Sequence, residues 1–314
     1  MTTNGQTNDK FFLEQLKSVK SDSGEYYKNI GFIGKGGNGV AYVVLCTSGA
    51  LRGQIFVLKV LYKISSAERI QRFWDEVAFL EDQSNPSIMR FFDKGTFAGR
   101  PFMITSYLPN TLADELKKGI TLGNALLYTT QLLSALNFLH QKQVVHRDIK
   151  PQNIFINNTR AILGDFGLIK HVGDEGIVQD DVDYMNESSA IGGSELQGYV
   201  AMPFFYRTPE LVAYANRETN LTTASDIFQL GLVIAEMFCG KNPLQRANNI
   251  KDPVVLNPIG KINGKFGARI VRILEGMLKY NPTERPSVSK LLDDFTGLYG
   301  DYARDKFSLD GSIF

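Results

Sequence analysis

Polar residues between His146 and Asn153 have the types and the spacing that phosphoryl transfer needs. The run reads His146-Arg147-Asp148-Ile149-Lys150-Pro151-Gln152-Asn153, and Asp165-Phe166-Gly167 begins twelve positions after its last residue. Phosphoryl transfer requires two oxygens held in line and neutralisation of the charge on the transferred group. Asn153 and Asp165 offer oxygen ligands of the kind that Mg²⁺ ions bind together with substrate phosphates. Asp148 can accept or orient a hydroxyl proton, so the pattern predicts a phosphoryl-transfer site.

A glycine-rich segment is the second candidate for phosphate contact. It reads Gly34-Lys35-Gly36-Gly37-Asn38-Gly39 and is weak evidence alone, because the chain has 29 glycines in 314 residues. A β-type run, Val40–Leu45, follows it, and no Ser or Thr follows its Gly-Lys pair. Both features argue against dinucleotide and Walker-type phosphate loops. We therefore expect a glycine flap between two strands.

Further motifs appear in order, and together the motifs resemble the eukaryotic-type protein kinase family over about residues 27–300. Lys59 in Val57-Leu58-Lys59 stands where that family has its strand lysine, and Glu76 stands at its regulatory-helix glutamate. Thr208-Pro209-Glu210 stands where the family has Ala-Pro-Glu. The resemblance implies that Lys59 holds the α- and β-phosphates, that Glu76 holds Lys59, and that Asp148 and Lys150 act at the transferred phosphate.

The resemblance also implies ATP and Mg²⁺ as cofactors. The implied Mg²⁺ ligands are Asn153 and Asp165, the implied gatekeeper is Thr105, and the implied hinge is Ser106-Tyr107-Leu108. The implied nucleotide contacts lie in the glycine segment, in the strands beside it, in the hinge and at Phe155, two positions after Asn153. They are Gly34, Gly36, Gly39, Ala41, Val57, Lys59, Thr105, Tyr107 and Phe155. Ala41 and Val57 exchange the valine and alanine usual in the family. The exchange roughly conserves volume, so we expect a repacked roof over the nucleotide.

The elements that must position these residues follow from periodicity. Strand-type runs at Tyr42–Leu45 and Ile55–Val60 and a helix near Ser66–Asp82 predict a small sheet with one helix. Helical spacing then dominates the second half, with predicted helices near 122–140, 225–239, 266–280 and 286–299. The cluster Phe11, Phe12, Leu13 and Leu16 predicts a short amphipathic helix near the start.

The resemblance gives these elements an α+β, two-lobed kinase fold. It implies an N-lobe at residues 27–107 and a C-lobe at 108–300, with an N-terminal extension at 1–26 and a C-terminal tail at 301–314. Three architectural contacts are implied as well. The first is an ion pair between Glu210 and Arg285. The second is an anchor from Asp226 to the backbone of residues 146–153, the catalytic loop. The third is a stacked apolar spine that links the lobes and consists of Leu80, Phe91, His146 and Phe166.

Composition bounds the class of protein. With 43% hydrophobic and 21% charged residues the chain is an ordinary globular protein, and its net charge of +1 argues against a nucleic-acid-binding surface. Its two cysteines, Cys46 and Cys239, lack metal-site spacing. The polar start lacks the order of a secretory signal, and no apolar run approaches the ~18 residues that span a bilayer. We expect a cytoplasmic protein that acts on protein substrates and does not enter a membrane.

The acceptor residue is indicated by two signals that conflict. Lys150, two positions after Asp148, is typical of serine/threonine kinases, whereas Pro203 stands where tyrosine kinases of this family place a proline. We favour Ser or Thr and leave dual specificity open. A pseudokinase scaffold would be expected to lack Lys59, Asp148 or Asp165, which are all present. A kinase-fold phosphotransferase for small molecules usually lacks a segment like Thr208-Pro209-Glu210.

The stretch from Asp165 to Glu210 predicts regulation. It contains Ser188, Ser189, Ser194 and Tyr199 as candidates for autophosphorylation, and Arg147 is the family position that pairs with a loop phosphate. Residues 171–206 hold seven acidic residues and no Lys or Arg, a pattern typical of a solvated loop, an internal inhibitor or a docking surface for a basic partner. Leu112 and Gln152 stand where basophilic members carry glutamates, so we expect no strong preference for arginine in substrates.

Overall fold

The computed structural model describes residues 16–35, 39–64, 66–172, 206–216, 218–219, 221–247, 249 and 251–309. The described chain forms two compact units: the first holds residues 16–84 and 89–107, and the second holds residues 85–88 and nearly everything from Leu108 onward. The helix predicted around Phe11 and the regulatory stretch 173–205 lie outside the described residues.

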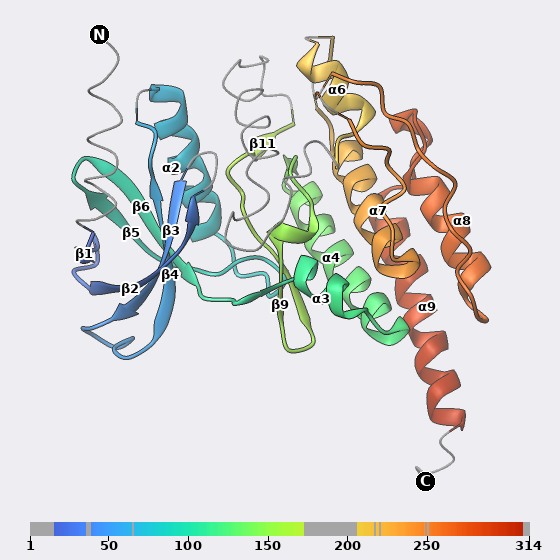
Figure 1. Cartoon of the computed structure of the whole chain (residues 1–314), viewed down its shortest axis with the longest axis horizontal. Coiled ribbons are helices and arrows are strands. Elements are labelled where there is room, and N and C mark those ends of the chain that lie inside the picture. The colour runs from blue at the N-terminus through green and yellow to red at the C-terminus, as the bar shows by residue number, and fades with distance from the viewer. Residues whose placement is uncertain are drawn as a thin grey trace. The chain divides into compact units, whose positions relative to one another are not determined.

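The first unit is built on a six-stranded antiparallel sheet (Figure 1). Its strands are β1 (Ser18–Lys20), β2 (Tyr26–Lys35), β3 (Gly39–Cys46), β4 (Ile55–Leu61), β5 (Phe91–Phe97) and β6 (Arg100–Ser106), and their spatial order is β1-β2-β3-β4-β6-β5. Burial alternates along β3, where Val40, Tyr42 and Val44 enter the core while Ala41 and Val43 face the other side. This alternation is the two-residue period that predicted the strand.

Helix α2 (Ala67–Glu81) contacts β5 and β6 in this unit. Ser66 caps it by accepting a hydrogen bond from the backbone N–H of Arg69 at 3.4 Å. Phe73, Val77 and Leu80 are buried at helical spacing, so one face of the helix joins the core. The predicted helix near Ser66–Asp82 is confirmed, and its end residues are the two caps.

The second unit is mainly helical (Figure 1). Its helices are α3 (Leu112–Lys118), α4 (Leu122–Gln141), α6 (Pro209–Ala215), α7 (Thr223–Cys239), α8 (Gly267–Met277) and α9 (Val288–Leu309), with 3-10 turns η1 (Pro151–Asn153) and η3 (Pro282–Glu284). Helix α4 contacts both α7 and α9. Most of α7 is buried, from Ser225 to Met237 with the exception of Glu236, so this helix forms the centre of the unit.

Short strands support the loops of the second unit. Strands β7 (Asn110–Thr111), β9 (Ile154–Asn157) and β10 (Arg160–Leu163) form one small sheet, and β8 (Val144–Val145) pairs with β11 (Lys170–His171). The β9–β10 hairpin aligns Ile154 with Leu163. As a result, Asn153 and Gly164 lie at the same open end of the hairpin, where the backbone N–H of Gly164 donates to the carbonyl of Asn153 at 2.8 Å.

The structure extends the sequence analysis at both ends of the described chain. Ser18–Lys20 forms an edge strand on β2, and Val19 is buried there beside Leu16. Helix α9 continues to Leu309, beyond the predicted end near Tyr299. Within the described residues, no helix is both long enough and apolar enough to cross a membrane.

Candidate active site

The first unit brings together the two charged residues predicted for it. Lys59 on β4 donates from Nζ to both carboxylate oxygens of Glu76 on α2, at 2.8 and 2.9 Å. The Glu76 side chain is 4% exposed and that of Lys59 is 22% exposed, so the lysine reaches the surface while its partner is buried. Two regular elements, a strand and a capped helix, therefore fix the position of this ammonium group.

Residues predicted to contact the nucleotide share the sheet face that carries Lys59. Ala41 pairs with Lys59 and Val57 pairs with Thr105 across neighbouring strands, and the strand period places Ala41, Val57 and Lys59 on one side of the sheet. Thr105 is buried at the end of β6, and Tyr107 beyond it is exposed. This face is only half-buried, in contrast to the opposite face, which forms the core.

The glycine segment is described only at its two ends. Gly34 pairs with Ala41 across β2 and β3, while Gly36 lies outside the described residues. At Gly39 a Cβ atom would lie 2.9 Å from the carbonyl oxygen of Val60, so a side chain there would collide with the backbone of β4. A glycine is required at position 39 because the two backbones approach so closely.

In the second unit, α7 holds the backbone of the catalytic loop, as the sequence predicted for Asp226. Asp226 is fully buried, and its two oxygens accept hydrogen bonds from the backbone N–H groups of His146 and Arg147, both at 2.9 Å. Nε2 of His140 lies 3.2 Å from the same carboxylate. One turn further along α7, Gln229 accepts from the N–H of Ile149 at 3.0 Å.

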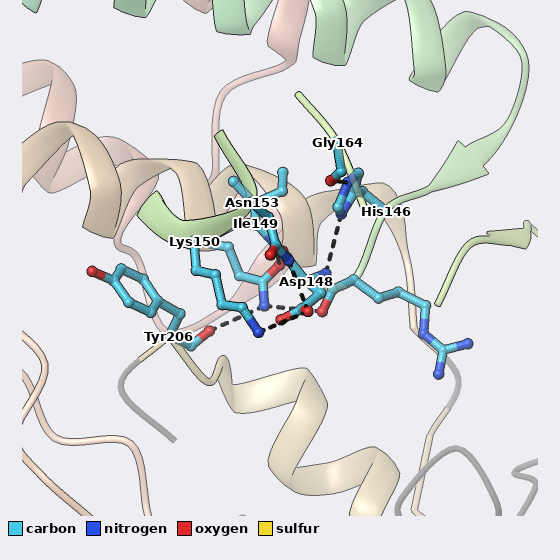
Figure 2. A network of polar contacts seen from close by, with 9 residues as sticks. His146, Asp148, Ile149, Lys150, Asn153, Gly164 and Tyr206 are labelled. Carbon is cyan, nitrogen blue, oxygen red and sulfur yellow. Dashed lines mark hydrogen bonds and ion pairs between the residues drawn. The ribbon is translucent and has the colours of Figure 1, made fainter. Parts of the chain in front are cut away.

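Asp148 is held in place by two other residues of the predicted site, Lys150 and Asn153, as Figure 2 shows. Nζ of Lys150 and Nδ2 of Asn153 each donate to Oδ2 of Asp148 at 2.9 Å. Asn153 also donates to the Asp148 carbonyl at 2.9 Å. The carboxylate is therefore fixed by two donors on one oxygen.

His146 supports this loop from within the core. The ring is fully buried, its Nδ1 accepts from the backbone N–H of Asp148 at 3.3 Å, and its Nε2 lies 3.1 Å from the carbonyl of Gly164 (Figure 2). These partners require the neutral tautomer with the proton on Nε2. Burial lowers the pKa of His146 below its usual 6.5, although the carboxylates of Asp226, Asp148 and Asp165 oppose that shift.

The two predicted Mg²⁺ ligands lie in backbone segments that are joined at the open end of the β9–β10 hairpin. Asn153 precedes β9 and Asp165 follows Gly164, the residue hydrogen-bonded to Asn153. Both bonds of the Asn153 side chain are donated by its NH₂ group, which leaves the carbonyl oxygen for a hard cation. Asp165 has φ of +56°, a left-handed conformation that non-glycine residues rarely adopt and that is common at functional sites. This oxygen donor set fits Mg²⁺.

The predicted ion pair between Glu210 and Arg285 is present and buried. Thr208 caps α6, Pro209 occupies its first turn and Glu210 follows, which places the glutamate near the helix N-terminus. Arg285 also donates to the carbonyls of Lys279, Ala224 and Tyr280, at 2.7, 2.7 and 3.0 Å. The pair ties the start of α6 to the turn before α9.

Other predicted site residues are placed only within their own units. The rings of His146 and Phe166 touch, with centroids 4.8 Å apart, but Leu80 and Phe91 belong to the first unit, so the spine linking the units stays a prediction. Phe155 lies half-buried on β9 between the buried Ile154 and Ile156. Pro203 lies outside the described residues.

Gln229 is the site residue that the sequence analysis missed. It follows Asp226 by three positions, and in a helix such residues lie on the same face. That spacing was the available signal, because a polar residue beside a predicted anchor on a buried helix requires polar partners.

Comparisons with known proteins identify relatives over most of the chain. Residues 27–295 match the protein kinase domain family. The chain is 25% identical over 277 residues to a putative serine/threonine-protein kinase A of Trypanosoma brucei brucei, covering 84% of this chain and 59% of that protein. It is 28% identical over 277 residues to mitogen-activated protein kinase kinase kinase 5 of Arabidopsis thaliana, covering 83% and 35%. It is 27% identical over 278 residues to serine/threonine-protein kinase Nek3 of Mus musculus, covering 85% and 48%. The chain matches 35% to 59% of the length of these relatives.

Proposed function

The chain belongs to the protein kinase domain family, and we propose that it transfers the γ-phosphate of ATP to Ser or Thr hydroxyls of protein substrates. The observation that carries the proposal is the cluster in which Lys150 and Asn153 both bind Asp148. Lys150 is the residue that favours a Ser or Thr acceptor. The relatives named as serine/threonine kinases support the same choice.

The proposed chemistry follows from the charges around Asp148. Lys150 and Asn153 fix the position of its carboxylate, which would orient the acceptor hydroxyl and take its proton. The Lys150 ammonium lies beside that position and would neutralise charge developing on the transferred phosphoryl group. Asn153 and Asp165 would hold Mg²⁺, which supplies further positive charge to the phosphates.

In the first unit, Lys59 would hold the α- and β-phosphates. Its two bonds to Glu76 fix the ammonium, so binding the phosphates would require little reorganisation of the site. The half-buried face with Ala41 and Val57, together with Thr105, Tyr107 and the glycines at 34, 36 and 39, would bind the nucleotide. Phe155 would contribute from the second unit. We propose that the N-lobe comprises residues 27–107 and the C-lobe residues 108–300.

We further propose that the stretch between Asp165 and Glu210 is autophosphorylated. Arg147 is buried, and its guanidinium lies 5.3 Å from the ring centroid of Tyr214, while Nζ of Lys170 lies 5.9 Å from the same centroid. Two cations gathered at one ring form a basic position that would attract a loop phosphate. Mass spectrometry of ATP-treated protein should find loop phosphate that is absent from Asp148→Asn.

The function is tested by incubating the chain with radiolabelled ATP, Mg²⁺ and a peptide library. The unmodified chain should label Ser and Thr peptides, and Asp148→Asn should lose at least about 100-fold of that activity. Asp294→Asn is the matched control, because Asp294 is exposed on α9 and pairs with Lys290 there. Nucleotide binding without any transfer would indicate a pseudokinase scaffold, and transfer only to small molecules would indicate the other alternative. Either result would overturn the proposal.

A further inference from the structure

Gln229 on α7 joins three backbone positions that the sequence separates widely. Its side-chain oxygen accepts from the N–H of Ile149 at 3.0 Å, and its NH₂ group donates to the carbonyls of Arg147 and Tyr206, both at 3.1 Å. The residue is 2% exposed. All three partners are backbone groups, so they determine which way the amide is turned, and both of its N–H donors are used.

The first two partners flank Asp148. The Arg147 carbonyl belongs to the peptide group that precedes Asp148, and the Ile149 N–H belongs to the one that follows it. One planar amide therefore spans the residue whose carboxylate Lys150 and Asn153 orient. Asp226 binds the N–H groups of His146 and Arg147, which lie just before these two peptide groups in the sequence. Asp226 and Gln229 of α7 therefore bind consecutive parts of the loop.

The third partner begins the segment that leads to α6. Tyr206 lies two positions before Thr208, the residue that caps α6 and accepts from the N–H of Leu211 at 3.0 Å. The hydroxyl of Tyr206 donates to Glu236, which lies two turns after Gln229 on α7. Helix α7 therefore holds Tyr206 at both its backbone and its side chain. Ile149 and Tyr206 are both labelled in Figure 2.

We propose that Gln229 is a positioning residue that couples the backbone around Asp148 to the segment beginning at Tyr206. The inference deepens the proposed kinase function and rests on it for its effect on catalysis. Without the Gln229 amide, Asp226 still anchors the start of the loop, but the peptide groups around Asp148 and the Tyr206 segment lose their shared contact. Phosphoryl transfer depends on alignment of the attacking hydroxyl, so a loss of coupling lowers kcat.

The first variant is Gln229→Met, which keeps the length of the side chain and removes all three hydrogen bonds. We expect kcat to fall about 10- to 100-fold, because small misplacements of a catalytic group have effects of that size. The KM for ATP should stay within about twofold, since the hydrogen bonds that this amide makes among the described residues go to the loop and to Tyr206. Gln131→Met is the matched control. Gln131 on α4 also bonds two backbone groups, the N–H of Ala161 at 2.7 Å and the carbonyl of Thr159 at 3.1 Å, away from Asp148.

The second variant, Gln229→Glu, separates positioning from a general loss of structure. Its carboxylate can still accept from Ile149, but it places negative charge beside the carbonyls of Arg147 and Tyr206. Burial there raises the pKa of the new carboxyl, and its protonated form regains one donor. The ratio of its kcat to that of the unmodified chain should therefore rise as pH falls, whereas the same ratio for Gln229→Met should not.

Amide hydrogen exchange gives a readout that does not require activity. In Gln229→Met, exchange should rise about tenfold at the Ile149 N–H, as expected for loss of one buried hydrogen bond, and it should rise together in residues 206–211. Gln131→Met should change neither region. Unchanged exchange at either place, or exchange that changes while kcat stays within twofold of the parent, would overturn the proposal. If the parent chain transferred no phosphate, the proposed function would fail, and exchange in the two regions would still decide the coupling.

Discussion

The ion pair of the first unit and the catalytic loop of the second are held in place by different kinds of contact. Lys59 and Glu76 meet through their side chains, and the lysine is 22% exposed. In the loop, the N–H groups of His146, Arg147 and Ile149 are bound by buried side chains of α7. The Lys59 ammonium lies where solvent reaches it, so it can be hydrated if it loses its partner, whereas a buried N–H group that loses its acceptor stays without one.

Because of this difference, substitutions in the two regions should affect catalytic activity and folding stability to different extents. A change at Lys59 should affect mainly the charge presented to a nucleotide, while a change in an α7 anchor should lower the free energy of unfolding before any effect on chemistry is considered. The predictions below test that separation in order of expected size.

Arg285→Met should have the largest effect. It would leave the buried Glu210 carboxylate without its counter-ion and three carbonyls without a donor, so the free energy of unfolding should fall by about 3–5 kcal/mol. Urea denaturation measures the change. Arg269→Met is the control, because its pair with Asp301 is exposed and should be worth about 0–1 kcal/mol. Equal losses in the two variants would show that burial does not set the size of the effect.

Lys59→Met should have the largest effect on activity. We expect kcat/KM to fall about 100- to 1,000-fold. Because the Glu76 carboxylate is buried and loses its partner, the free energy of unfolding should also fall, by up to about 3 kcal/mol, which is less than in Arg285→Met, where three carbonyls lose their donor as well. Steady-state kinetics and urea denaturation measure the two quantities. Lys94→Met is the control, because Lys94 on β5 also pairs with a glutamate of α2, Glu81, and their side chains are 34% and 48% exposed. A loss of stability in Lys59→Met as large as that in Arg285→Met, or similar kinetics in Lys59→Met and Lys94→Met, would contradict the separation.

Asp226→Asn should show the reverse profile. The asparagine keeps one oxygen, so one of the N–H groups of His146 and Arg147 loses its acceptor. Because hydrogen bonds to charged groups contribute about 1.5–3 kcal/mol, we expect a loss of that order in the free energy of unfolding. Amide exchange at residues 146 and 147 should rise in parallel. A variant with parental stability and exchange but reduced kcat would place Asp226 among residues that act on chemistry.

The sequence predicted the residues whose role depends on type and order, and it missed those whose role depends on distant backbone groups. Lys59, Glu76, Asp148 and Asn153 were found because their motifs occur in register. The structure shows the predicted contact between Lys59 and Glu76, and it adds a contact between Asn153 and Asp148 that the sequence did not predict. Gln229 was missed because its three partners lie in backbone segments that only the fold brings to α7.

The same reason explains the two errors at element ends. Ser18–Lys20 is too short for a two-residue period to be recognised, and it is a strand because β2 lies beside it. Helix α9 passes Tyr299 because tertiary contacts support its last turns: Asp301 pairs with Arg269 of α8, and the ring of Tyr302 lies 6.4 Å from that of Phe266. Local pattern does not contain either contact.

The smallest predicted effect is a pH dependence of the free energy of unfolding that arises from His146 in the catalytic loop. Burial lowers the pKa of His146 below 6.5, so between its folded and unfolded values the unfolded chain binds more protons. Stability from this residue is therefore complete above about pH 6.5 and is lost as pH falls, by at most about 1.4 kcal/mol per pH unit. Protonation would also put a hydrogen on Nδ1, which faces the N–H of Asp148.

The measurement is the free energy of unfolding between about pH 8 and about pH 5.5, a range that includes the ordinary histidine pKa of about 6.5. The parent chain should show this slope there. In His146→Phe the slope should diminish, although the variant loses two hydrogen bonds and starts from a lower stability. Lys59→Met should keep the parental slope, since it leaves His146 in place. A slope that persisted unchanged in His146→Phe would mean that other groups titrate in this range and that the neutral, buried imidazole is not what makes the loop sensitive to acid.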